Sequence, residues 1–220
     1  METKIMNERI KSFTAHRSRV KGEKLTNFKT NVLPQYEIKH FNDIKTSGNI
    51  SLEIGSGFGQ TVNHLASQNQ ETMFIACEVF IDGIYAICSK IEENKLENIR
   101  IYQNDARILL EEIPNGRLEN IYLLFPDPWP KKKHHKRRIL TDEFLAEMKR
   151  VLKPEGKLWI ATDDASYQEW MIEILKQQKH LIWENENNYL NEPIWWTKTK
   201  FQMKAEEVGR ISNFFVLWNQ

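Results

Sequence analysis

Cysteine and long apolar runs are scarce in this sequence, and each shortage excludes a class of protein. The chain has only two cysteines among 220 residues, Cys77 and Cys88, and they do not form a CxxC pair. Neither a disulfide framework nor a metal site is therefore expected. No apolar run is long enough to cross a membrane, and the N-terminal run METKIMNERIKSF is too charged for a secretory signal. We expect a cytoplasmic protein with no membrane partner.

Basic residues are in almost no excess either, because 31 Lys and Arg face 30 Asp and Glu. Their placement is uneven. Residues 1–40 carry nine Lys or Arg against four acids, and residues 131–138 read KKKHHKRR with no acid. Two such regions on a nearly neutral chain suggest one face that binds a polyanion. A charged face that meets only solvent is the alternative.

Apolar spacing after residue 49 alternates between two periods, which is typical of an α/β protein. Short apolar runs predict strands at 50–54, 72–77, 99–102, 120–125, 157–161, 181–183 and 211–218. Helical spacing predicts helices at 58–69, 80–95, 106–113 and 140–152, and a capping box of Ser166 and Glu169 predicts another. Strands that alternate with helices form a mostly parallel sheet flanked by helices. We therefore expect one domain over residues 41–220, preceded by a basic N-terminal extension over residues 1–40.

Polar and glycine residues follow the first three predicted strands. Glu53 lies near the end of the first strand and is followed by glycines at alternate positions, Gly55, Gly57 and Gly59. Glycine permits a tight turn and lets a ligand approach the backbone closely, although an ordinary strand-to-helix turn is the alternative. Glu78 ends the second strand, and Asp105 follows the third. Ligands of parallel sheets bind at this edge, so the pattern favours a nucleotide-like ligand.

The segment after the fourth predicted strand reads FPDPWPKKKHHKRR, residues 125–138. Prolines on both sides of Asp127 predict a stiff, non-helical segment, which suits a fixed catalytic carboxylate. Trp129 could stack on a base or pack beneath the loop. The basic run suits phosphate contacts by Lys132, Lys133, Lys136, Arg137 and Arg138.

Two resemblances follow from these motifs. The GxGxG spacing after Glu53 resembles the Rossmann-like class I methyltransferases. The segment FPDPWPKKKHHKRR is similar to the signature of the bacterial tRNA (guanine-N7)-methyltransferases, and Ala161–Asp163 and Thr199–Gln202 resemble two later motifs of that family. The resemblance implies a class I methyltransferase fold, S-adenosyl-L-methionine as cofactor and tRNA as partner. It also implies that the acceptor is N7 of a guanine in the variable loop (position 46).

The resemblance also implies roles for individual residues. The cofactor would contact Glu53, Gly55, Gly57, Gly59, Glu78, Asp105, Ala106 and Asp127, of which Asp127 would also be the catalytic residue. The RNA or its target guanine would contact Lys131, Asp163, Thr199, Lys200, Phe201 and Gln202. Gln202 stands where the motif commonly ends in Glu, and Ala205 stands where a glycine is common. Gln202 can offer a carbonyl and an amide but no negative charge.

The proposed acceptor sets the chemical requirement. Guanine N7 carries a lone pair and no proton, so the enzyme must align it with the methyl group rather than deprotonate it. A fixed carboxylate, Asp127, could stabilise the positive charge that develops on the ring. Trp195 and Trp196 could stack on the base or simply pack.

Other functions stay open on the sequence alone. Asp127-Pro128-Trp129 loosely resembles the motif of adenine amino-group methyltransferases, but the second consecutive proline is missing. A nicotinamide dehydrogenase is disfavoured by the glycine spacing, and a non-catalytic RNA-binding module by the four carboxylates. The oligomeric state stays open between monomer and homodimer.

Overall fold

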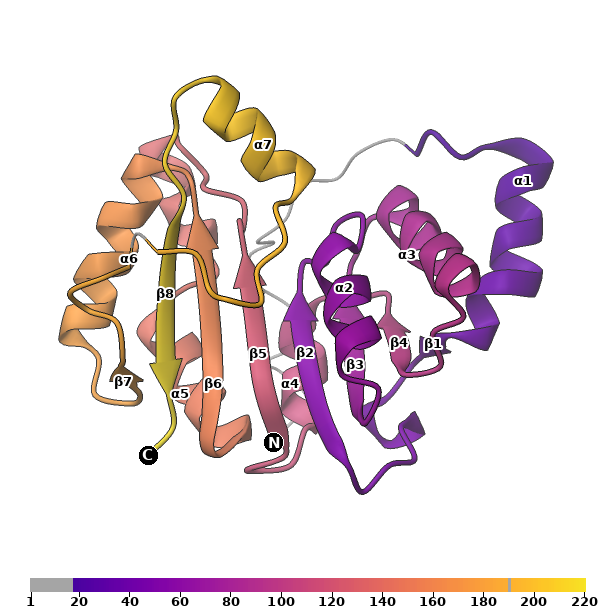
Figure 1. Ribbon diagram of the computed structural model, residues 1–220, viewed down its shortest axis with the longest axis horizontal. Helices are drawn as coiled ribbons and strands as arrows, with labels where there is room; N and C mark the ends of the chain where they lie inside the picture. The colour runs from indigo at the N-terminus through magenta and orange to yellow at the C-terminus, as the bar shows by residue number, and fades with distance from the viewer. Residues whose placement is uncertain (1–17, 190) are drawn as a thin grey trace.

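An eight-stranded sheet forms the centre of the computed structural model, which describes residues 18–189 and 191–220 (Figure 1). The side chains of Lys200 and Phe201 lie outside that description. The strand order is β1-β4-β3-β2-β5-β6-β8-β7. The strands are β1 (Glu37–Ile38), β2 (Asn49–Ile54), β3 (Thr72–Cys77), β4 (Ile99–Tyr102), β5 (Leu118–Leu124), β6 (Leu152–Thr162), β7 (Ile182–Trp183) and β8 (Asn213–Trp218).

The six strands β1, β4, β3, β2, β5 and β6 pair with their neighbours in parallel, as the sequence predicted for most of the sheet. Only β8 against β6, and β7 against β8, run antiparallel among the described pairs. In register, Glu53 of β2 lies between Ala76 of β3 and Tyr122 of β5. The carboxyl ends of β2, β3, β4 and β5 therefore share one edge.

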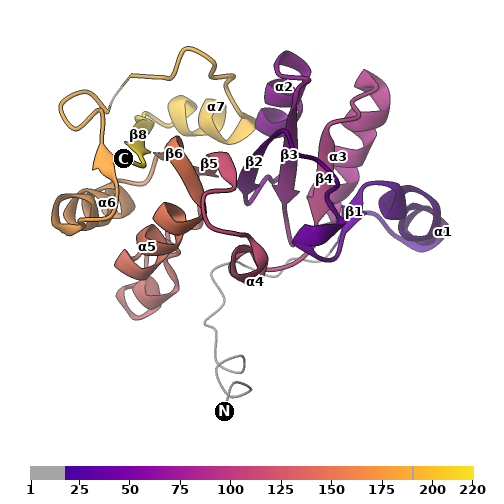
Figure 2. The same cartoon turned by 90° about the horizontal axis from the view of Figure 1, so that it is seen from below.

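Helices cover both faces of the sheet (Figure 2). One face carries α4 (Ala106–Glu112), α5 (Asp142–Val151) and α6 (Ala165–Gln177), and the other carries α2 (Gln60–Gln68), α3 (Ile81–Asn94) and α7 (Lys200–Glu207). Within the described part of the chain, no helix is both long and apolar enough to cross a membrane. The predicted three-layer α/β architecture is confirmed.

The core has two parts because the strands are buried on both faces. In β3, Ile75 and Cys77 pack towards α4 and α5, whereas Phe74 and Ala76 pack towards α2 and α3. Cys77 and Cys88 are both free and buried, so they serve as small core residues. Alternate residues of one strand thus hold two helical layers on a single sheet.

The start of α6 differs from the sequence prediction. Asp164, rather than Ser166, is the N-cap, and its carboxylate accepts a hydrogen bond from the Tyr167 N–H at 2.9 Å. The Ser166 hydroxyl donates to the same carboxylate at 2.8 Å. A carboxylate at the N-terminus of a helix satisfies a free N–H group and interacts favourably with the helix dipole. The predicted capping box was wrong by two residues.

Residues 22–38 belong to the predicted basic extension and end in β1, a strand of the sheet. They form α1 (Gly22–Asn27), a π-helical turn (Phe28–Val32), a 3-10 turn (Leu33–Gln35) and β1. Phe28 and Leu33 are buried, and the Phe28 ring lies edge-on to Tyr85 of α3 at 5.0 Å. Residues 1–17, which include Arg17, lie outside the described residues.

Replacing Phe28 by Ala should lower the free energy of unfolding by about 3–5 kcal/mol, because the buried ring leaves a cavity. Urea unfolding measures this value. Val208→Ala, at a side chain that is 70% exposed, is the control and should stay within about 0.5 kcal/mol of wild type. A Phe28→Ala protein as stable as the control would mean that this segment adds nothing to the core.

Candidate active site

A cavity of about 500 Å³ opens at the carboxyl ends of β2, β3, β4 and β5. This is the edge at which parallel α/β sheets bind ligands, and the volume suits a small molecule. The chain segments that follow these four strands line it. The structure brings together there the four carboxylates that the sequence singled out, Glu53, Glu78, Asp105 and Asp127.

The glycine loop after β2 forms one wall of the cavity. Gly55, Gly57 and Gly59 all have positive φ angles, of 76°, 53° and 70°, a region that residues with a side chain rarely adopt. A Cβ at Gly59 would lie 2.5 Å from Cγ1 of Ile87 in α3, so α2 and α3 can pack closely only around a glycine. A Cβ at Gly55 would meet open space. The loop therefore exposes backbone to the cavity on one side and packs on α3 on the other.

Glu53 lies at the end of β2 and is only 4% exposed. Its Oε2 atom is buried and has no hydrogen-bond partner. Burial raises the pKa of Glu53 to about 8, although interactions with Ser56 and Val62 oppose the shift, because removing a charge from water is unfavourable. A cationic group of a ligand in the cavity would supply the missing partner.

Glu78 is also buried, but its carboxylate is well satisfied. It accepts hydrogen bonds from the N–H groups of Gly57 at 2.7 Å, Val79 at 2.7 Å and Phe80 at 2.8 Å. Burial raises the pKa of Glu78 although these three donors oppose the shift. The side chain thereby ties the glycine loop to the turn between β3 and α3.

Asp105 has two structural partners at the start of α4. Its carboxylate caps the helix by accepting from the Arg107 N–H at 3.0 Å, and it pairs with the Arg107 guanidinium at 2.5 Å. Ala106 is buried in the first turn and lines the cavity beside it. The Asp105 carboxylate therefore caps α4 and also lines the cavity.

Asp127 is exposed in the wall of the cavity, in the loop after β5. Phe125 and Trp129, on either side of it, have positive φ angles of 51° and 47°, so the loop is non-helical, as predicted. The Trp129 ring packs beneath Arg137, whose Cζ atom lies 4.7 Å from the ring centroid, and edge-on to His134. Of the two interpretations of Trp129, the structure favours packing.

The basic run divides into exposed and buried members. Lys131, Lys132, Lys133 and Lys136 are exposed along a 3-10 helix (Lys132–Arg137). Arg138 is only 3% exposed. Its guanidinium donates to the Pro128 carbonyl at 2.9 Å and to the carbonyl and hydroxyl of Ser166 at 3.2 and 2.9 Å. Arg138 is thus buried and joins the Asp127 loop to α6, and its predicted phosphate contact stays a prediction.

The predicted substrate residues are spread over two places. Thr199 lines the cavity and caps α7, and Lys200 begins that helix. Asp163 does not line the cavity. It forms an ion pair with Arg210 at 3.1 Å, in a separate recess beside the start of α6.

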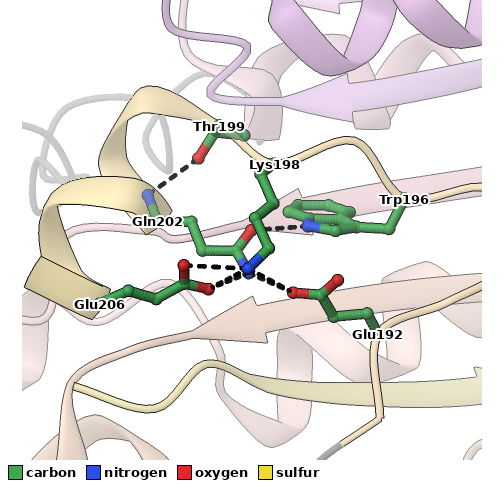
Figure 3. Close-up of polar contacts among 6 residues, drawn as sticks. All are labelled: Glu192, Trp196, Lys198, Thr199, Gln202 and Glu206. Carbon is green, nitrogen blue, oxygen red and sulfur yellow. Dashed lines mark hydrogen bonds and ion pairs between the residues drawn. The ribbon is translucent and has the colours of Figure 1, made fainter. Parts of the chain in front are cut away.

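Gln202 is 1% exposed, and its carboxamide bonds to Trp196, Glu192 and Glu206 (Figure 3). The carboxamide of Gln202 is thus buried and occupied by protein partners, and the predicted substrate contact stays a prediction. Trp195 packs edge-on to Tyr122 and Trp159. The two tryptophans pack, as one of the two interpretations held.

Sequence reasoning missed Asp82, in the first turn of α3. Its carboxylate accepts from the Ser18 hydroxyl at 2.5 Å and from the N–H groups of Arg19 at 2.8 Å and Val20 at 3.3 Å. Burial disfavours the charge, but these hydrogen bonds outweigh it and lower the pKa of Asp82. The contact places Arg19 in the cavity wall. No spacing signal links residues so far apart in the sequence.

Metal-binding geometry is absent from residues 18–189 and 191–220, where no group of three or more His, Cys, Asp or Glu side chains could hold an ion. The cavity instead presents backbone, carboxylates and apolar side chains.

Known proteins resemble this chain over most of its length. A family model with the description "Putative methyltransferase" matches residues 47–213. A tRNA (guanine-N(7)-)-methyltransferase of Agrobacterium fabrum is 39% identical over 167 residues, 75% of this chain and 72% of that protein. A protein of the same name from Nitrosomonas eutropha is 38% identical over 72% of this chain and 70% of its own length. An rRNA methylase from Streptococcus thermophilus shares the fold, with a TM-score of 0.52 and 11% identity over 80% of this chain and 90% of that one.

Arg138→Lys should lower the free energy of unfolding by about 2 kcal/mol, since Lys keeps the charge but cannot bond Pro128 and Ser166 together. Urea unfolding measures the change. Lys136→Gln, at an exposed position of the same run, is the control and should shift stability by less than about 0.5 kcal/mol. Unchanged stability of Arg138→Lys with weaker binding to RNA would instead support the phosphate-contact role.

Proposed function

This chain belongs to the tRNA (guanine-N(7)-)-methyltransferase family, and we propose that it transfers a methyl group from S-adenosylmethionine to N7 of a guanine in tRNA. The Rossmann-like class I methyltransferase fold expected from the sequence is confirmed by the mostly parallel sheet and the solved structure that shares it. The observation that carries the proposal is the cavity in which Glu53, Glu78, Asp105 and Asp127 meet a glycine loop.

The residues of the cavity fit the proposed cofactor. When bound, S-adenosylmethionine supplies an electrophilic methyl group on a positively charged sulfur. Glu53, whose buried Oε2 lacks a partner, suits the cationic part of that molecule. Glu78 would accept from ribose hydroxyls, because a carboxylate has lone pairs beyond those used by three N–H groups. Asp105 and Ala106 would face the adenine, and Gly55, Gly57 and Gly59 let the ligand lie against the backbone.

Asp127 is the proposed catalytic residue. Guanine N7 needs no general base, so the protein must hold the ring in line with the methyl group and stabilise the positive charge that reaches it. The Asp127 carboxylate stands in the wall of the cavity, and Thr199 contributes to the same wall. We place the guanine between these residues and the cofactor.

RNA would lie across the exposed lysines of the loop after β5. Lys131, Lys132, Lys133 and Lys136 can contact phosphates, which supply affinity without reading the sequence. Arg137 covers Trp129 and would add to the same positive field. We further propose that the target lies in the variable loop, that Asp163 contacts the RNA after parting from Arg210, and that the protein works in the cytoplasm.

Incubation with labelled S-adenosylmethionine and an unmodified tRNA transcript, followed by nucleoside analysis, tests the proposal. We expect 7-methylguanosine. Asp127→Ala should reduce turnover by about 100-fold or more, by loss of the charge that stabilises the ring, and should leave RNA binding intact. Glu143→Ala, an exposed acid on α5, is the control. Another methylated nucleoside would refute the proposed acceptor, and unchanged turnover with weaker RNA binding would refute the role of Asp127.

Cofactor binding should release a proton near neutral pH. Since the pKa of Glu53 is about 8, its carboxyl is mostly protonated at pH 7 in the free protein, and a bound cation favours the carboxylate. Affinity should therefore rise with pH and level off above about 8. Calorimetry in two buffers of different ionisation enthalpy measures the proton. Glu53→Gln should abolish both effects, and an equal proton release in that variant would contradict the assignment.

A further inference from the structure

A cluster of polar side chains joins α7 to the segment before it (Figure 3). The segment 192–199, called here the strap, crosses the sheet on the side of α2 and α3, and α7 lies near the carboxyl ends of β5 and β6 (Figure 1). The members of the cluster are Glu192, Trp196, Lys198, Thr199, Gln202 and Glu206.

Gln202 is the centre of this cluster. Its Oε1 accepts from the Trp196 indole N–H at 2.6 Å. Its Nε2 donates to Glu192 Oε1 at 2.6 Å and to Glu206 Oε1 at 3.1 Å. Only a carboxamide offers an acceptor on one atom and two donors on the other. Every polar atom of this buried side chain is therefore used.

The charges around Gln202 disfavour a further negative charge at this position. Glu192 and Glu206 face it with negative charge, and Lys198 is their shared cation, at 2.8 Å from Glu206 and 3.8 Å from Glu192. The hydrogen bond from Lys198 lowers the pKa of Glu206, so Glu206 meets the carboxamide as a carboxylate at neutral pH. Lys198 offsets one of the two negative charges, and the two neutral N–H donors of Gln202 give each carboxylate a hydrogen bond without adding charge.

The cluster is connected to the Asp127 loop through Trp196. The Trp196 ring packs on Phe125 at 5.9 Å and on Phe214 at 4.9 Å between centroids. Phe125 opens the loop two residues before Asp127. On the other side of the cluster, the Thr199 hydroxyl accepts from the Gln202 N–H at 3.1 Å, and Thr199 lines the cavity. The side chain of Gln202 thus acts on the Asp127 loop through Trp196, whereas its backbone N–H bonds to Thr199.

We propose that Gln202 is a positioning residue for methyl transfer, which holds Trp196 against Phe125 by donating to Glu192 and Glu206 while accepting from Trp196. The inference rests on the proposed function. A carboxylate at position 202 would lose both donors and place a third negative charge beside Glu192 and Glu206, so repulsion would move it away from the Trp196 N–H. The neutral side chain is a requirement of its surroundings in this chain.

Gln202→Glu is the first test, with methylation of tRNA followed by kcat and KM. At pH about 8 we expect kcat/KM to fall by about tenfold or more, because buried like charges meet without a donor between them. As the pH falls to about 6, the ratio of variant to wild type should rise. The introduced carboxyl, once protonated, can again donate to a glutamate and accept from Trp196. Glu192, Lys198 and Glu206 are the charged groups that face it.

The exchange variant Glu192→Gln/Gln202→Glu is the matched control, because it keeps the composition and net charge of the cluster and reverses one donor–acceptor pair. It should recover part of kcat/KM, because position 192 regains a hydrogen bond to position 202 whereas Glu206 still faces a carboxylate. An exchange variant as impaired or as poorly folded as Gln202→Glu, or a Gln202→Glu variant with wild-type kinetics at pH about 8, would overturn the proposal.

Hydrogen exchange of the Trp196 indole N–H with solvent separates this proposal from the proposed function. The exchange is followed by NMR, and the signal is assigned with Trp196→Phe. The N–H should be protected in wild type and in the exchange variant, and should exchange at least about tenfold faster in Gln202→Glu. This result is measurable even if the wild-type protein methylates no tRNA, which would refute only the proposed function. Equal protection in all three proteins would refute the positioning role.

Discussion

Parallel pairing of β2 with β3 and β5 is the constraint on which the site depends. The pairing fixes Glu53 beside Ala76 and Tyr122, and it brings the chain segments after several strands to one edge. Side chains separated by more than twenty residues in the sequence thereby line a single cavity. A shift of β2 by one residue would turn Glu53 to the other face of the sheet and bring Leu52 or Ile54, which are buried in the core, into its place.

Two buried glutamates at this edge behave differently because their partners differ. Three backbone N–H groups satisfy Glu78 within the protein, so its charge stabilises the loop whether or not a ligand is present. Glu53 keeps an oxygen without a partner and a pKa raised by burial. An unsatisfied buried group is unfavourable in the free protein. Glu53 is therefore the carboxylate whose charge a cationic ligand would change most.

Local signals predicted much of the fold and the position of the cavity. The period of the apolar residues and the spacing of the glycines identified three carboxylates at or just after strand ends, Glu53, Glu78 and Asp105. Both features depend on neighbouring residues alone. Arg138, Gln202 and Asp82 could not be assigned in the same way. Arg138 is buried against α6, and Asp82 holds a segment more than sixty residues away. A basic or polar residue in a motif does not reveal whether its side chain is exposed to solvent or buried in the protein.

Side-chain contacts hold the Asp127 loop before and after the carboxylate, so its prolines alone do not determine where the loop lies. Proline restricts φ but does not fix where a loop lies relative to the sheet. Arg138 bonds the carbonyl of Pro128 immediately after Asp127, and Trp196 packs on Phe125 just before it. The first contact comes from the end of the same loop and the second from the strap. The position of the carboxylate therefore depends on two separate contacts, one made by Arg138, which the motif assigned to RNA, and one by Trp196, whose role the sequence left open.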